Sequence, residues 1–286
     1  MQKRALAVHD LSCVGRCSLT VALPILSAAG VNTAVIPTAL LSTHTGEFTG
    51  YTHLDLSDQL SPIAAHLATL GLHFDAFYSG YLASGAQVEQ ILSMLDQLCD
   101  SETHIFVDPA FADHGRRYSL IDESMPAQMR RLCARANTIV PNLTEAAFLL
   151  DEPYRPDISP DGLKEQLRRL AAMGPDRVVI TSAPATRPGH CAAVAYDREQ
   201  GRFWKMESPY IPAFYPGTGD TFSSVLVGAF LQGDSLPVAL ERAVRFVTLG
   251  IRVTYGYDTR HSDGVLLERT LPALQDRCAI GEYEAF

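Results

Sequence analysis

The fold is decided by residues 5–36, which read ALAVHDLSCV GRCSLTVALP ILSAAGVNTA VI. Residues 5–9 are a short apolar run typical of a buried strand, and residues 33–36 are a second one. Between them, residues 18–29 have the length and apolar spacing of a helix. Because a strand, a helix and a strand in this order connect neighbouring parallel strands, the start of the chain predicts a parallel sheet.

The same alternation continues along most of the chain. The further elements that it predicts are helices at 57–70, from Ser84 to 98, at 121–135, at 143–150 and from Ser159 to Gly174, strands at 74–79, 104–108, 138–141 and 177–181, and a hairpin of 192–196 with 202–206. The chain after Gly219 is predicted to be mostly helical. We therefore predict an α/β fold with a mostly parallel central sheet and helices on both faces. No linker, repeat or low-complexity tract interrupts the pattern, so we expect one domain over residues 1–286.

Charge and composition exclude several classes of partner. The chain has 286 residues, a net charge of -9 and an isoelectric point of about 5.4. Such a protein has no long-range positive field, so we expect neither nucleic acid nor an anionic membrane as a partner. No apolar run is long enough to cross a bilayer, and no basic-then-apolar leader opens the chain.

The cysteines and lysines also restrict the chemistry. Three residues separate Cys13 from Cys17, but no second pair completes a set of four zinc ligands. Scattered cysteines of this kind fit a reducing, cytoplasmic location. The three lysines, Lys3, Lys164 and Lys205, lie outside the glycine-rich segments, which argues against chemistry that needs an active-site lysine.

The segment with the clearest chemical meaning is Gly217-Thr-Gly-Asp220, which precedes an apolar run at helical spacing. Glycines at a helix start let successive amide N–H groups point into one concavity, where the helix dipole favours negative charge. Asp220 in this place has two readings. It is either an ordinary first-turn acid, or a general base that deprotonates a hydroxyl while the amides stabilise a transferred phosphoryl group.

Other glycine-rich and catalytic motifs are missing. The chain contains no P-loop, no dinucleotide-binding fingerprint after its first strand, no nucleophile elbow and no H-E-x-x-H. In-line phosphoryl transfer needs a nucleophile on one side of the phosphorus and charge stabilisation around it. A general base would activate the nucleophile, and the neighbouring main-chain amides would stabilise the charge on the phosphoryl group.

An ordered set of segments resembles the ribokinase-like superfamily and, within it, the pyridoxal/pyridoxamine (vitamin B6) kinases. The segments are residues 8–18 (VHDLSCVGRCS), 42–46 (STHTG), 79–82 (SGYL), 107–109 (VDP) with Asp113, 141–145 (PNLTE), 179–182 (VITS) and 216–221 (PGTGDT). The resemblance runs nearly end to end. It implies a site at the carboxyl ends of the strands and phosphorylation of the 5′-hydroxymethyl group of a B6 vitamer with ATP and Mg²⁺.

The same resemblance assigns roles to individual residues. Asp220 matches the catalytic base, and Gly217, Thr218 and Gly219 match the anion hole, with Thr218 also on the ATP side. The remaining nucleotide and metal positions are Asn142, Glu145, Thr181 and Ser182 for ATP, and Asp108, Asp113 and Glu145 for the metal. Potassium is a further candidate cofactor, since relatives commonly use a monovalent cation. Taken singly, these residues also fit plain structural roles, such as a helix cap for Asn142 or a first-turn acid for Glu145.

Four residues are the candidates for binding the vitamer. Asp10 ends the first predicted strand, where many B6 kinases carry a serine, and its carboxylate would pair with a protonated ring nitrogen or with another donor. His44 and Thr45 match the H-T-G loop, and Tyr81 is placed to stack on the ring. The plainer alternatives are a packing role for Tyr81 and a backbone-bonded loop histidine for His44.

Three functions remain open from the sequence. The leading one is an ATP-dependent B6 kinase that acts as a homodimer, as the resemblance implies. The first alternative is a hydroxymethylpyrimidine kinase, which shares the scaffold and acts on a similar aromatic alcohol. The second is a catalytically silent vitamer-binding protein, against which the presence of both Asp220 and Glu145 argues.

Overall fold

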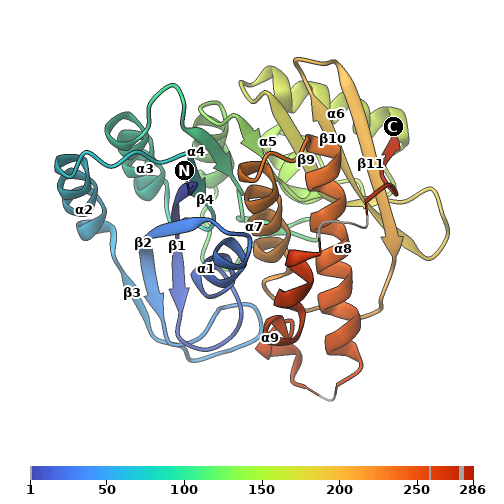
Figure 1. Cartoon of the computed structure of the whole chain (residues 1–286), viewed down its shortest axis with the longest axis horizontal. Helices are drawn as coiled ribbons and strands as arrows, with labels where there is room; N and C mark the ends of the chain where they lie inside the picture. The colour runs from blue at the N-terminus through green and yellow to red at the C-terminus, as the bar shows by residue number, and fades with distance from the viewer. Residues whose placement is uncertain (1, 258, 277–279) are drawn as a thin grey trace.

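The computed structural model describes residues 2–257, 259–276 and 280–286. Ten strands form one central sheet in the order β12-β11-β10-β9-β8-β5-β4-β1-β2-β3 (Figure 1). The strands are β1 Arg4–Ser12, β2 Asn32–Leu41, β3 His53–Asp55, β4 Ala76–Ser79, β5 His104–Val107, β8 Thr138–Ile139, β9 Arg177–Pro184, β10 His190–Asp197, β11 Arg202–Pro209 and β12 Glu284–Ala285. A separate hairpin pairs β6 Ala112–Asp113 with β7 Arg116–Arg117.

The middle of the sheet is parallel, as the strand–helix alternation predicted. The pairs β2/β1, β1/β4, β4/β5, β5/β8 and β8/β9 are all parallel. Antiparallel strands lie at both edges, with β3 beside β2 at one and β10, β11 and β12 beyond β9 at the other. The predicted α/β fold is therefore confirmed, and so is the predicted hairpin, as β10 and β11.

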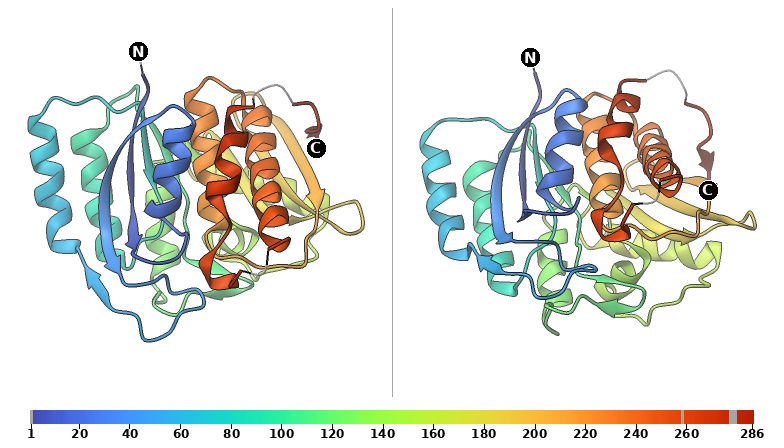
Figure 2. Two further views of the ribbon diagram at one scale, coloured as in Figure 1. Left: turned by 60° about the horizontal axis from the view of Figure 1, so that its bottom comes forward. Right: turned by 90° about the horizontal axis from the view of Figure 1, so that it is seen from below.

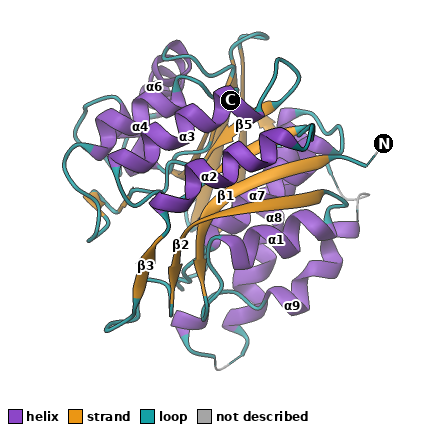
Figure 3. Ribbon diagram, turned by 90° about the vertical axis from the view of Figure 1, so that its left-hand side faces the viewer, coloured by secondary structure: helices purple, strands orange, loops and turns teal. Residues whose placement is uncertain are grey.

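Helices cover both faces of the sheet (Figures 2 and 3). Their bounds are α1 Leu19–Ala28, α2 Ser57–Thr69, α3 Gly85–Leu98, α4 Met125–Cys133, α5 Leu143–Leu149, α6 Pro160–Ala172, α7 Thr218–Leu231, α8 Leu236–Tyr255 and α9 Leu267–Thr270. Helices α2 to α6 pack in sequence order on one face, and α1, α7, α8 and α9 lie on the other. None of the helices in the described part of the chain is both long and apolar enough to cross a membrane.

Each face has its own apolar core because strand side chains alternate between the two faces. In β1, Leu6 and Val8 pack under helices α2 to α6, whereas Ala5 and Ala7 pack under α1 and α7. Most of β1 is buried on both sides, which explains its continuous apolar run.

The structure corrects several predicted element boundaries. β1 continues to Ser12, so Asp10 lies inside the strand and does not end it. β9 continues to Pro184, so Thr181 and Ser182 also lie inside a strand, at a bulge where the pairing with β10 shifts. The short strands β3, β6, β7 and β12 were not predicted, because two or three residues carry too little periodicity to be recognised.

Candidate active site

A cavity of about 470 Å³ lies at the edge of the sheet where the parallel strands end. All of the residues proposed from the sequence for catalysis, vitamer, ATP or metal line this cavity. They come from distant parts of the chain, because β1, β4, β5, β8 and β9 are parallel and place their carboxyl ends side by side. The parallel strand order therefore brings the residues of the sequence motifs together in one cavity.

The glycine turn forms one wall of the cavity. Gly217 has a φ of +79°, and a Cβ there would collide with the main-chain oxygen of Arg16, so only glycine fits. Helix α7 begins at the next residue, and the amides of its first turn have no acceptor within the helix. Among the described residues, no atom outside the chain neighbours of Gly219 and the nearby backbone of α7 lies within 4 Å of the place where a Cβ of Gly219 would stand. The turn therefore offers main-chain donors to an anion in open space.

Asp220 lies in the first turn of α7 and faces this same cavity. Its Oδ2 accepts a hydrogen bond of 2.9 Å from the main-chain N–H of Ser18. Burial, and then the negative charge of Asp108, raise the pKa of Asp220 to about 7, although the bond from Ser18 opposes the shift. A carboxyl group with a pKa near neutrality is suited to accept a proton during catalysis.

Asp108 follows the end of β5 and lies beside α7. Its Oδ2 accepts a 2.7 Å hydrogen bond from the Ser223 hydroxyl, one turn after Asp220. Burial raises the pKa of Asp108 to about 6. Helix α7 thus carries the predicted base, Asp220, and also positions the predicted metal ligand, Asp108, through the hydroxyl of Ser223.

Asn142 and Glu145 form a reciprocal capping box at the start of α5. Asn142 Oδ1 accepts from the amides of Thr144 and Glu145, and Glu145 Oε2 accepts from the amide of Asn142. The other oxygen, Glu145 Oε1, accepts from the amides of Phe111 and Ala112. Burial and the nearby Asp108 raise the pKa of Glu145. This carboxylate therefore anchors the chain segment after Asp108 to α5.

Asp113 is the most solvent-exposed of the three carboxylates predicted to bind the metal. It lies in β6, in the hairpin whose tip is formed by His114 and Gly115. Its Oδ1 accepts from the amide of His114, and the imidazole of His114 lies 3.6 Å from its Oδ2. The hairpin places Asp113 at the rim of the cavity.

Both ring nitrogens of His44 bond to the main chain. Nδ1 accepts from the amide of Gly46, and Nε2 lies 2.6 Å from the carbonyl oxygen of Ser262, to which it donates. The ring also packs against Gly15, where a Cβ would collide with it. The alternative of a loop histidine bonded to backbone therefore describes His44, and Thr45 beside it keeps a place in the cavity lining.

Asp10 is buried, and its carboxylate has two hydroxyl donors. Ser18 Oγ donates to Oδ1 at 2.5 Å, and Ser12 Oγ donates to Oδ2 at 3.4 Å. Burial raises the pKa of Asp10. Tyr81 also lines the cavity and is partly buried against the apolar core, so its predicted packing and stacking roles are compatible.

The bulge in β9 gives Thr181 and Ser182 their positions. Thr181 forms an isolated bridge with Asn142, and Ser182 has a φ of +58°. A non-glycine residue with such a φ is strained, and strain of this kind concentrates at functional sites. Both residues line the cavity on the side of α5.

The charge of the cavity is one-sided. Five carboxylates line it, from Asp10, Asp108, Asp113, Glu145 and Asp220, and no lysine or arginine belongs to the lining among the residues described. Within the described ranges, no group of three or more His, Cys, Asp or Glu residues forms a complete metal site, Cys13 and Cys17 included. Carboxylate oxygens suit Mg²⁺, which needs few protein ligands when phosphate oxygens share its coordination.

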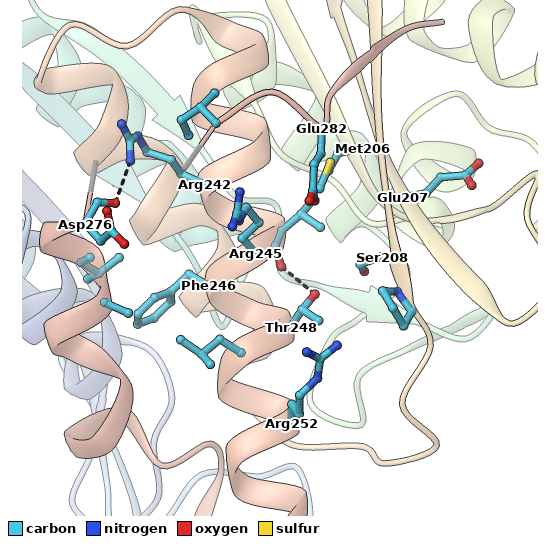
Figure 4. Close-up of a pocket in the computed structure, with 16 residues that line it drawn as sticks. Met206, Glu207, Ser208, Arg242, Arg245, Phe246, Thr248, Arg252, Asp276 and Glu282 are labelled. Carbon is cyan, nitrogen blue, oxygen red and sulfur yellow. Dashed lines mark hydrogen bonds between the residues drawn. The ribbon is translucent and has the colours of Figure 1, made fainter. Parts of the chain in front are cut away.

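A second cavity, of about 550 Å³, lies between α8 and β11 (Figure 4). Met206, Ser208 and Phe246 line it together with three arginines of α8, Arg242, Arg245 and Arg252. None of the residues proposed from the sequence belongs to its lining. Glu207, Asp276 and Glu282 line it as well, so acidic and basic side chains balance in this second cavity. The candidate active site is the acidic cavity, where carboxylates occur without lysine or arginine among the described residues.

A model of the phosphomethylpyrimidine kinase family matches residues 23–265, which is most of the chain. The chain belongs to the phosphomethylpyrimidine kinase family. This confirms that the seven ordered segments identify a kinase. The predicted ribokinase-like fold is also confirmed, since a solved pyridoxal kinase superposes on 96% of the chain.

Several relatives of this phosphomethylpyrimidine kinase family member carry B6 names. A Bacteroides thetaiotaomicron protein provisionally assigned as a phosphomethylpyrimidine kinase, crystallised with pyridoxal, is 44% identical, with all of each chain covered and a TM-score of 0.96. The pyridoxal kinase of Lactobacillus plantarum is 35% identical, covers 96% of this chain and 97% of its own, and has a TM-score of 0.87. The pyridoxine kinase of Bacillus subtilis (strain 168) is 28% identical over 210 residues, 70% of this chain and 74% of its own.

Sequence reasoning missed several residues that line the active site of this kinase. Ser18 and Ser223 bond to the site carboxylates, while Tyr118 and Phe214 line the cavity without a motif of their own. Ser223 follows Asp220 by three residues, and this helical spacing was the one available signal for it. Nothing local marks Ser18 as a partner of Asp220, which is 202 residues away.

Proposed function

We propose that this protein transfers the terminal phosphoryl group of ATP to the 5′-hydroxymethyl group of a vitamin B6 vitamer. One observation carries the proposal: the Asp220 carboxylate, with a pKa of about 7, lies beside the open amides of the Gly217–Gly219 turn in one cavity. Family membership and the pyridoxal bound by the Bacteroides thetaiotaomicron relative support it.

In the proposed mechanism Asp220 is the general base. Ser18 holds Oδ2, which leaves Oδ1 to accept the proton of the vitamer hydroxyl as that oxygen attacks the phosphorus. The main-chain N–H groups of Thr218 and Gly219 stabilise the charge on the transferred group, because they are fixed in the helix start before the reaction begins. Asn142, Thr181 and Ser182 would bind the rest of the nucleotide from the opposite wall.

The acidic cavity requires cations before a triphosphate can enter it. With five carboxylates and no lysine or arginine among the described lining residues, repulsion would exclude ATP alone. Asp108 and Asp113 would hold Mg²⁺, which neutralises phosphate charge when bound. Glu145, also named from the sequence as a ligand, already accepts three amides, so we propose that it positions the segment after Asp108. Potassium is a second candidate cation, tested by replacing KCl with a bulky ammonium chloride.

For the vitamer, we propose that Asp10 faces the polar edge of the pyridine ring and Tyr81 its flat face. Thr45 and the loop held by His44 complete the wall beside them. The buried carboxylate of Asp10 would pair with a protonated ring nitrogen, because a charge in such surroundings needs a partner of opposite sign.

The test is a set of separate ATP-dependent assays with pyridoxal, pyridoxine, pyridoxamine and hydroxymethylpyrimidine. We expect phosphorylation of at least one B6 vitamer at a higher kcat/KM than that of the pyrimidine. Hydroxymethylpyrimidine kinase is the second candidate, because the matching family carries that name. Turnover of the pyrimidine alone would establish it, and tight vitamer binding without ADP release would establish a silent binding protein.

Further parts of the proposal concern the protein as a whole. We propose that residues 1–286 act as one kinase domain in a cytoplasmic homodimer, without nucleic acid or membrane as a partner. The acidic isoelectric point supports the part of this proposal that excludes nucleic acid and anionic membranes. Light scattering coupled to size exclusion measures the oligomeric state, and a monomeric mass would refute the dimer.

A further inference from the structure

Ser18 bonds to two of the proposed functional carboxylates at once. Its main-chain N–H donates to Asp220 Oδ2 at 2.9 Å, and its hydroxyl donates to Asp10 Oδ1 at 2.5 Å. Ser18 is buried, so water does not readily replace either bond. One residue therefore connects the proposed base to the proposed vitamer contact, which lie 210 positions apart in the chain.

The hydroxyl of Ser18 is not explained by a helix-capping role. Ser18 occupies the N-cap position of α1, but its side chain makes no capping hydrogen bond there. Serine at this position normally accepts from an amide of the first helical turn. Here the side-chain hydroxyl donates to Asp10 instead, so it bonds to a residue of the cavity lining.

The backbone of Ser18 is held in an unfavourable conformation. Its φ is +52°, a region that L-residues other than asparagine and aspartate rarely adopt. The loop before it is fixed, because Gly217 packs on the carbonyl of Arg16 and Thr20 Oγ1 bonds to the carbonyl of Cys17. A strained residue retained by its surroundings is typical of a functional position.

We infer that Ser18 is a positioning residue that sets the spacing between Asp10 and Asp220, and so aligns the vitamer hydroxymethyl group with its base. The inference rests on the proposed function. Through the main chain, Ser18 leaves Oδ1 of Asp220 available for the proton. Through the hydroxyl, it fixes one oxygen of Asp10 and directs the carboxylate toward the ring.

The test compares Ser18→Gly with Ser18→Ala. Both variants delete the hydroxyl and keep the amide, but glycine adopts a positive φ without strain whereas alanine does not. We expect both to lower the vitamer kcat/KM about tenfold, as for the loss of one hydrogen bond to a charged group, with the KM for ATP unchanged. Ser84→Gly, at the N-cap of α3 outside the cavity lining, is the matched control and should keep full activity.

A double-mutant cycle shows whether the hydroxyl acts through Asp10. In an Asp10→Ala background, Ser18→Gly should cause no further loss, because its acceptor is already gone. An equal loss in both backgrounds overturns the inference. So does a result in which Ser18→Gly is fully active and only Ser18→Ala fails, since that assigns Ser18 a purely conformational role.

The inference and the proposed function fail in different experiments. Turnover by the wild-type protein tests the function, whereas coupling between Ser18 and Asp10 tests the inference. If the wild type binds pyridoxal without turnover, the same cycle is measured on pyridoxal dissociation constants. Thermal melting of each variant shows that it is folded, and the glycine variant keeps the test valid if the alanine variant does not fold.

Discussion

The Ser223 hydroxyl donates a 2.7 Å hydrogen bond to Oδ2 of Asp108, across 115 positions of the chain. This bond ties the end of β5 to helix α7, and both residues are buried. Because the neighbouring turn of α7 carries Asp220, the bond also holds the proposed base and the proposed metal ligand in one rigid arrangement.

Ser223→Ala should weaken cation binding more than it weakens folding. Without its donor, the buried Asp108 holds a negative charge less readily, and its pKa rises further above about 6. We expect the magnesium concentration for half-maximal activity to rise several-fold at pH 7. The measurement is activity against MgCl₂ concentration at saturating ATP, and an unchanged midpoint would contradict the role of this bond.

Asp220→Asn should lower kcat by about 10²- to 10⁴-fold, the usual contribution of a general base. An asparagine keeps the shape and still accepts from Ser18, but it takes no proton. Binding of a non-hydrolysable ATP analogue should stay within about twofold, because a base contributes chiefly in the transition state. Steady-state kinetics and calorimetry check both statements. The matched control is Asp161→Asn on the exposed face of α6, and near-normal turnover in Asp220→Asn would remove Asp220 from the mechanism.

The raised pKa of Asp220 also predicts how stability depends on pH. The folded state holds this proton up to about pH 7, whereas the unfolded chain releases it near its ordinary value of 3.8. Folding is therefore destabilised increasingly as pH rises from about 4 to 7. Asp220→Asn removes this cost, so its melting temperature should exceed that of the wild type at pH 8 and the difference should vanish by about pH 4. A difference that is independent of pH would mean that Asp220 is not protonated in the folded state.

Removal of divalent cations should abolish nucleotide binding rather than merely slow the reaction. Five carboxylates line the cavity, and within the described residues no lysine or arginine accompanies them to offset a triphosphate. Calorimetric titration of an ATP analogue should give a measurable affinity with MgCl₂ and none with EDTA. Comparable affinity under both conditions would show that the amides of the glycine turn bind the nucleotide phosphates without a divalent cation.

Asn142→Ala should destabilise the protein by about 1 to 2 kcal/mol, since it deletes the N-cap of α5. It also removes the bond from Asn142 Nδ2 to the carbonyl of Ala112, and so loosens the segment that carries Asp113. We expect a rise in the KM for ATP beside the lower stability. Ser159→Ala removes the N-cap of α6, outside the cavity lining, and should lose similar stability with normal kinetics. Equal kinetics in the two variants would limit Asn142 to a structural role.

Two features of the site were readable before any coordinates. Asp108 ends the strand predicted at 104–108, and Asn142 directly follows the strand predicted at 138–141. Parallel strands place such ends along one edge of the sheet. The glycine turn identified Asp220, because glycines before a helix predict open amides wherever the helix lies. Roles for His44 and Glu145 were harder to assign, since a motif specifies residue types but not their bonding partners. The structure shows both residues bonded to main chain.

The sequence by itself determined the layered fold, the edge on which the site lies and the acids that gather there. These features follow from the local periodicity of apolar residues and from the alternation of strands and helices along the chain. Both depend on interactions between residues that are close in sequence. Only the tertiary structure decided that Ser18 joins Asp10 to Asp220, that Ser223 holds Asp108, and that burial brings the pKa of Asp220 near neutrality. Hydrogen bonds and desolvation depend on distances between residues far apart in the chain, and no local pattern encodes those distances.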